Sequence, residues 1–212
     1  KDVYRDEQGT IYRKTPSSWP IDAPIGYPIK SRADLRDAVI SRGSASLPME
    51  IQVILRKHAL WIDSNGKEGE RAVLGGVELG DTDMSNIYLS GADLRNCNWP
   101  DAKLSEGTFV LSDFRGANLQ NADFTRSDLS GADLGNANLA GARFHRATLA
   151  PLRLRRSNGD ATATSRAVNL RGADLRNASF NGAVMTDATT DDTLTDGVDL
   201  TGANIKGTSL QP

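Results

Sequence analysis

Large apolar residues recur at every fifth position from Leu74 to Leu154, although only 38% of the chain is hydrophobic. The pattern resumes at Leu170 and runs to Leu210, with threonine at positions 190 and 195. Residues five apart in an α-helix are rotated by about 140°, so they would share no apolar face. In a flat strand they would alternate between opposite faces, because five is odd. The backbone must therefore change direction once in every five residues.

The positions around each large residue indicate how the chain turns. A small residue stands two positions earlier, as Ala132 does before Leu134, and along extended backbone the two point to the same side. The residue between them is mostly Asp or Asn and is expected to face water. Two positions after the large residue, Gly, Asn or Asp dominates, and these residues accept left-handed turn geometry at low cost. Each repeat thus contains an inward pair, an outward polar residue and a corner.

This pattern, seen as GADLG at residues 131–135 and GADLR at residues 172–176, resembles the pentapeptide repeat family over residues 72–154 and 166–210. The resemblance implies an all-β solenoid, a right-handed quadrilateral β-helix in which four pentapeptides make one turn. Large residues would stack inside it at about the ordinary strand spacing of 4.8 Å. The expected ladders are Leu74, Leu94, Phe114, Leu134 and Leu154 on one side and Met84, Leu104, Phe124 and Phe144 on another.

The sequence before the coil divides into two parts. Residues 1–45 are predicted to be an irregular N-terminal segment in which residues 3–13 can form a hairpin and residues 15–30 follow an extended, proline-rich path. Residues 46–71 are predicted to be a short capping α-helix and link. Pro48 suits a first helical turn and Glu50 the positive end of the helix dipole. The apolar residues that follow have helical spacing.

The coil is predicted to occupy residues 72–154 and to continue over residues 169–212. The distance from Leu154 to Leu170 is 16 residues, one more than a multiple of five. Residues 155–168 between the two halves are read as a loop insertion. Loops that leave a rigid scaffold often carry function, and the alternative is a tolerated surface insertion.

Five arginines near this insertion are the candidate partner-binding residues. In a four-sided coil several of them fall on outward positions of adjacent sides, which would make a local basic patch. The functional hypothesis is docking to an acidic protein surface, and the alternative is an ordinary solvated face. The five residues are Arg143, Arg146, Arg153, Arg155 and Arg156.

Catalytic and metal-binding constellations are not evident in the sequence. The chain has two histidines, His58 and His145, and one cysteine, Cys97, which occupies an inward small position. We therefore expect no enzyme activity, no cofactor and no metal. The net charge of −2 indicates neither direct nucleic-acid binding nor an anionic surface for the molecule as a whole. No apolar run is long enough to span a bilayer, so no membrane partner is expected.

The leading functional hypothesis is a non-enzymatic structural or docking module, a rigid rod that binds a protein partner, within a bacterial or phage assembly or in the cytoplasm. The resemblance also implies an end-to-end homodimer through the C-terminal coil. The alternative, implied by some family members, is a DNA-mimicking modulator of DNA gyrase or topoisomerase. Residues 72–154 carry ten acidic and seven basic side chains, which is not the continuous negative stripe expected of a DNA mimic.

Overall fold

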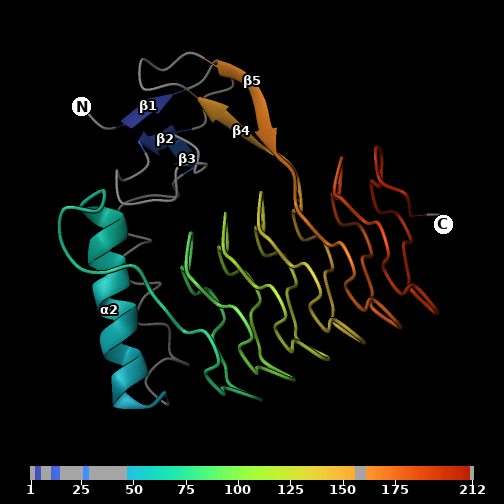
Figure 1. The fold of residues 1–212 in the computed structure, drawn as a ribbon, viewed down its shortest axis with the longest axis horizontal. Coiled ribbons are helices and arrows are strands. Elements are labelled where there is room, and N and C mark those ends of the chain that lie inside the picture. Colours follow the sequence, from blue (N-terminus) through green and yellow to red (C-terminus); the bar gives the residue numbers. More distant parts are fainter. Residues whose placement is uncertain (1–2, 6–10, 15–25, 29–46, 156–160, 211–212) are drawn as a thin grey trace.

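The computed structural model describes residues 3–5, 11–14, 26–28, 47–155 and 161–210, and it is dominated by a coil of stacked turns (Figure 1). Parallel bridges join residues 20 positions apart, as between Asp83, Lys103 and Asp123. Four such rows of bridges follow one another along the chain, so four pentapeptides make one turn. The bridges are isolated single-residue contacts, so the coil contains few regular strands. The five named strands all lie outside it.

The four sides of the coil are named here by the inward residues that stack along them. The third side has the predicted ladder of Met84, Leu104, Phe124 and Phe144, all buried. The rings of Phe124 and Phe144 stack with centroids 5.0 Å apart. The first turn of the coil contributes Leu74 to the first side, Leu79 to the second, Met84 to the third and Leu89 to the fourth.

The predicted loop at residues 155–168 is a β-hairpin, and it starts earlier than expected. Strand β4 (Leu152–Arg155) pairs antiparallel with β5 (Ala161–Arg166). Across the hairpin the bridge spacing grows from 20 to 36 residues, as between Asp133 and Asn169. The prediction that Leu154 continues the first-side ladder was therefore wrong. The spacing of five between Leu149 and Leu154 is a coincidence of the hairpin sequence. Leu170 follows Leu134 in the first-side ladder.

Helix α2 (Met49–Asp63) forms within the predicted capping segment and lies at one end of the coil, opposite the C-terminus (Figure 1). Ile51 and Leu55 on its inner face join the same core cluster as Leu74. His58 fixes the helix to the first turn, because its Nδ1 accepts a hydrogen bond of 3.0 Å from the backbone N–H of Ala72. The helix thus covers the apolar interior at this end.

Near the N-terminus, β1 (Val3–Arg5), β2 (Ile11–Lys14) and β3 (Gly26–Pro28) form an antiparallel sheet in that order. The pairing of β1 with β2 falls in the range where a hairpin was expected. Most of the proline-rich stretch at residues 15–30 lies outside the described residues. Strand β3 contacts β4, which brings the N-terminal sheet next to the inserted hairpin.

A second apolar cluster lies outside the coil interior, where α2, the fourth side and β4 meet. Leu111 stands at a corner position in this cluster and has a positive φ of 61°. Its side chain is nevertheless only 9% exposed. We call this set the outer apolar cluster; its members are Trp61, Ile62, Tyr88, Val110, Leu111 and Leu152.

Candidate functional site: a polar groove along the third corner

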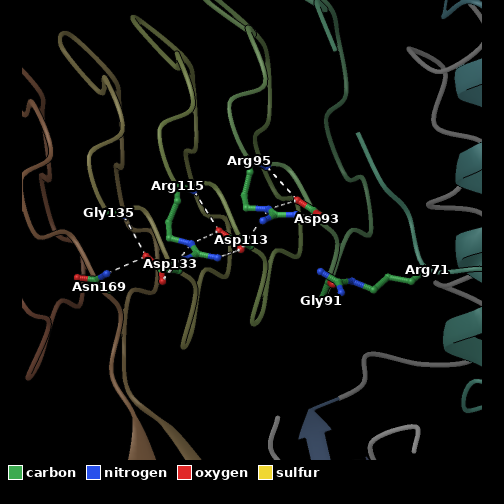
Figure 2. A network of polar contacts seen from close by, with 9 residues as sticks. All are labelled: Arg71, Gly91, Asp93, Arg95, Asp113, Arg115, Asp133, Gly135 and Asn169. Carbon is green, nitrogen blue, oxygen red and sulfur yellow. Dashed lines mark hydrogen bonds and ion pairs between the residues drawn. The ribbon is translucent and has the colours of Figure 1, made fainter. Parts of the chain in front are cut away.

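Two polar surfaces of the coil differ in how completely their charges are paired. On the first side, aspartate and arginine side chains alternate along the coil, with Asp93 and Arg95 in one turn and Asp113 and Arg115 in the next (Figure 2). Arg95 donates to Asp93 through Nε at 2.9 Å and Nη2 at 2.7 Å. Arg115 holds Asp113 with the same geometry. Because Arg95 and Arg115 each stand two residues after an aspartate, both side chains of each pair leave the same side of the extended backbone and meet.

The pairs are linked between turns as well. Arg95 lies 3.8 Å from Asp113, and Arg115 lies 3.8 Å from Asp133. The hydrogen bond from Arg95 lowers the pKa of Asp93. These guanidiniums are about half exposed, so screening by water keeps the contribution of each pair to stability small.

At Asp133 the first-side network ends in hydrogen bonds to neutral groups. Asp133 has Gly135 where an arginine would stand, and it accepts hydrogen bonds from the Gly135 N–H at 3.1 Å and from Asn169 Nδ2 at 2.8 Å (Figure 2). The first side is therefore internally satisfied, and its charges serve the stacking of the turns.

The second surface is a groove at the corner that follows the third side. It runs across successive turns and has a volume of about 490 Å³. The outward residues of each repeat at this corner provide its walls, because the coil repeats every 20 residues. We call it the third-corner groove; its lining residues are Ser105, Glu106, Asp123, Thr125, Arg126, His145, Arg146 and Asn181.

Most charges in the third-corner groove have partners. Arg126 lies 3.5 Å from Glu106, and Arg143, at the edge of the groove, donates to Asp123 at 3.1 Å. Partial burial raises the pKa of Asp123, but hydrogen bonds from Thr125 and Arg143 outweigh burial, so the pKa is lowered overall.

His145 and Arg146 complete the groove. His145 Nε2 lies 2.9 Å from Ser179 Oγ, so this ring is held in place by a hydrogen bond. The guanidinium of Arg146 has no ion pair or hydrogen bond among the described residues, and its side chain is exposed. The groove thus presents one unpaired cation, Arg146, in a lining that also holds paired charges and neutral hydroxyl and amide groups.

The five arginines predicted from the sequence are distributed over two parts of the molecule. Arg143 and Arg146 lie on the third side and at its corner, beside the groove. Arg153 is exposed on β4, and Arg155 belongs to the same strand, which follows the fourth side. Arg156 lies outside the described residues.

Sequence reasoning missed Arg126, which lines the groove with Arg146. The signal was present, because the two stand 20 positions apart, which is one turn of the coil. The same rule relates Glu106 to Arg126. The position of Asn181 could not be found this way, because the hairpin changes the offset between turns to 36 residues.

The described residues offer little for metal or thiol chemistry. Among them, no three His, Cys, Asp or Glu side chains gather closely enough to hold a metal ion. Burial raises the pKa of Cys97 to about 12, which keeps this thiol protonated and unreactive at neutral pH. No helix in the described part of the chain is long and apolar enough to cross a membrane.

Comparison with known proteins identifies the repeat. The sequence profile described as pentapeptide repeats matches in eight copies, and no curated protein matches the chain. The matched segments are residues 70–98, 82–121, 101–131, 117–150, 127–158 and 166–189.

Solved structures of the same kind are similar to this chain. One is HetL from the cyanobacterium Nostoc sp. strain PCC 7120, a pentapeptide repeat protein involved in heterocyst differentiation regulation, with 20% identity over 73% of this chain and 94% of HetL and a TM-score of 0.28. Another is alr5209, a pentapeptide repeat protein from Nostoc PCC 7120, with 22% identity over 71% and 93% and a TM-score of 0.39. A third is QnrB1, a plasmid-mediated fluoroquinolone resistance protein, with 16% identity over 65% and 72% and a TM-score of 0.27.

Proposed function

The chain belongs to the pentapeptide repeat family, and we propose that it acts as a non-enzymatic docking module, a rigid rod that binds another protein. We infer that the coil is right-handed, as the family resemblance implies. Ladders of buried side chains such as Leu104, Phe124 and Phe144 run along the coil, and packed interiors of this kind deform little. A rod of this kind can present outward side chains at fixed positions to a partner.

The observation that carries this proposal is the contrast between the first side and the third-corner groove. On the first side, Arg95 and Arg115 are each bonded to an aspartate. In the groove, the exposed guanidinium of Arg146 has no such partner among the described residues. A charge that the fold does not use for its own stability is available to a binding partner.

The alternative function, mimicry of duplex DNA, requires a continuous negative surface along the rod. On the first side positive and negative charges alternate, Arg171 there also pairs with an aspartate, and Arg143 on the third side pairs with Asp123. This alternation supports the docking module over the mimic. A supercoiling assay with purified DNA gyrase separates the two, because inhibition of gyrase or its protection from a quinolone at stoichiometric protein would overturn the docking proposal.

We also propose that two copies associate end to end through the last turns of the coil. Leu194 is 50% exposed there, and a second copy would remove it from water. Size-exclusion chromatography with light scattering tests this contact. A dimer that becomes a monomer in a Leu194→Asp variant supports the end-to-end contact, whereas a monomer at micromolar concentration would refute it.

The docking proposal itself is tested by affinity capture from the source cell followed by mass spectrometry. Two charge reversals divide the predicted arginines between the two parts of the molecule: Arg143→Glu with Arg146→Glu on the coil, and Arg153→Glu with Arg155→Glu and Arg156→Glu on the hairpin. We expect a specific partner that is retained by the hairpin variant and lost by the coil variant. Failure to capture any protein reproducibly would refute the docking function.

A further inference from the structure

At some corners of the coil, the residue types are not those that the period of five predicts. Corner residues adopt positive φ, and nearly all those in the described part are Gly, Asn or Asp, the types that accept this conformation most readily. Four are not. Leu111 belongs to the outer apolar cluster, and the other three line the third-corner groove: Glu106 with φ 58°, Arg126 with φ 59° and Arg146 with φ 56°.

The coil does not need these three residue types at this corner. One turn before Glu106 the same position is Asn86, and in the turn after Arg146 it is Gly182. Both are ordinary corner residues. Long charged side chains in the left-handed region cost conformational free energy, and such strain is concentrated at binding and active sites. Glu106 and Arg126 pair with each other across one turn, whereas Arg146 has no such partner among the described residues, so no contact within that part of the fold accounts for its side chain.

The arrangement of charge indicates which ligand the groove would take. The Glu106 carboxylate lies beside Arg126 at 3.5 Å, and Asp123 is bonded to Arg143, so Arg146 is the cation left for a ligand. A guanidinium presents a planar fork of donors that matches a carboxylate. Asn181, which also lines the groove, offers a neutral amide donor and acceptor, and the Thr125 hydroxyl, which donates to Asp123, still offers an acceptor oxygen, as a peptide backbone requires.

We propose that the third-corner groove binds an acidic segment of a partner protein, with a carboxylate of that segment bonded to Arg146. This inference rests on the proposed docking function and names the chemistry of the partner. Glu106 and Asp123 argue against a nucleic acid, because these carboxylates would repel a continuous row of phosphates. A polypeptide can place a single carboxylate beside Arg146 and keep its other acidic groups away from the groove's own acids.

The decisive variant is Arg146→Gly, because it removes the guanidinium and fits the backbone at φ 56° better than arginine does. The probe is a fluorescein-labelled peptide in which single glutamates are separated by serine and glycine residues, and the readout is fluorescence anisotropy at low and high salt. The native protein should bind the peptide in a salt-sensitive manner. In Arg146→Gly the affinity should fall about tenfold or more, and the midpoint of thermal unfolding should stay the same or rise.

Two controls match this variant. Arg171→Gln removes one exposed, paired arginine from the first side and should leave peptide affinity within about twofold of the native value. Asn86→Gly changes a corner residue one turn before Glu106 without changing the charge, and it should also leave peptide affinity within about twofold of the native value. A labelled duplex DNA serves as the competing ligand, and tighter binding of DNA than of the glutamate peptide would overturn the proposal.

The remaining outcomes separate this inference from the docking function. Equal affinity of the native protein and Arg146→Gly for the peptide, or no peptide binding by either, would refute the acidic-segment proposal. If the partner captured from cells is retained by Arg146→Gly, docking stands and the groove is not its site. If no partner is captured and no peptide binds, both proposals fail.

Discussion

Phe144 stacks on Phe180 with ring centroids 4.7 Å apart and ring planes within 2° of parallel, although the two residues are separated by 36 positions in the chain. Phe124 stacks on the other face of Phe144 at the ordinary separation of 20 positions. The ladder therefore passes the β4–β5 hairpin without a break in phase. The hairpin is inserted between two turns that pack as if it were not there.

Phe144 should be the most sensitive position of this ladder, because it is fully buried between two rings. We expect Phe144→Ala to lower the free energy of unfolding by about 3–5 kcal/mol, through lost burial and a residual cavity. Phe144→Leu introduces the residue type that the same ladder has at Leu104, and it should lower the free energy of unfolding by only about 1.5 kcal/mol. Urea unfolding followed by circular dichroism measures both, and equal losses would contradict the stacked-ring account.

Deletion of residues 151–166 should leave a folded coil. It joins Ala150 to Ala167 and restores a spacing of five between Leu149 and Leu170. We expect a single cooperative thermal transition, at a lower midpoint because Leu152 no longer packs in the outer apolar cluster. The matched control is deletion of residues 151–165, which leaves one extra residue in the repeat and should destroy cooperativity. Similar transitions in both deletions would show that the phase across the hairpin is unimportant.

His58 should make stability depend on pH. Burial, followed by the positive charge of Arg71, lowers the pKa of His58 from 6.5 to about 3. The unfolded chain therefore binds a proton that the folded protein does not, and stability that is complete above pH 6.5 is lost as the pH falls toward 3. The slope from this group is about 1.4 kcal/mol per pH unit.

The pH prediction is checked by urea unfolding between pH 5 and pH 6.5, above the range where most carboxylates titrate. The control is His58→Asn, whose amide oxygen can still accept the Ala72 N–H but carries no titratable group. We expect this variant to be less stable at pH 7 and to have a shallower slope. An unchanged slope would show that His58 is not the group responsible.

Leu111 and Arg146 share a strained backbone conformation but differ in their contacts, so the same substitution should have opposite effects. Leu111→Gly relieves strain of about 1 kcal/mol but removes a buried leucine side chain worth about 2–5 kcal/mol, so the protein should become less stable. Arg146→Gly relieves similar strain at an exposed side chain and should stabilise by up to about 1 kcal/mol. Thermal and urea unfolding of the two variants provide the comparison.

The inward and outward positions of the coil were predictable from the sequence, because they depend only on the two-residue alternation and the corner within one repeat. The ladder from Met84 to Phe144 follows from this local rule together with four repeats to a turn. The capping helix was predictable for the same reason, since its apolar face has the spacing of a single helix.

The hairpin and the groove were decided by tertiary structure. Leu154 keeps the period of five, and only its place in the strand pairing of Leu152–Arg155 with Ala161–Arg166 removes it from the coil. Arg126 and Arg146 become neighbours because the chain closes on itself every 20 residues. Local periodicity thus determined which side chains face inward, whereas contacts between turns, and the unpaired charge that they leave at Arg146, depend on how the whole coil closes.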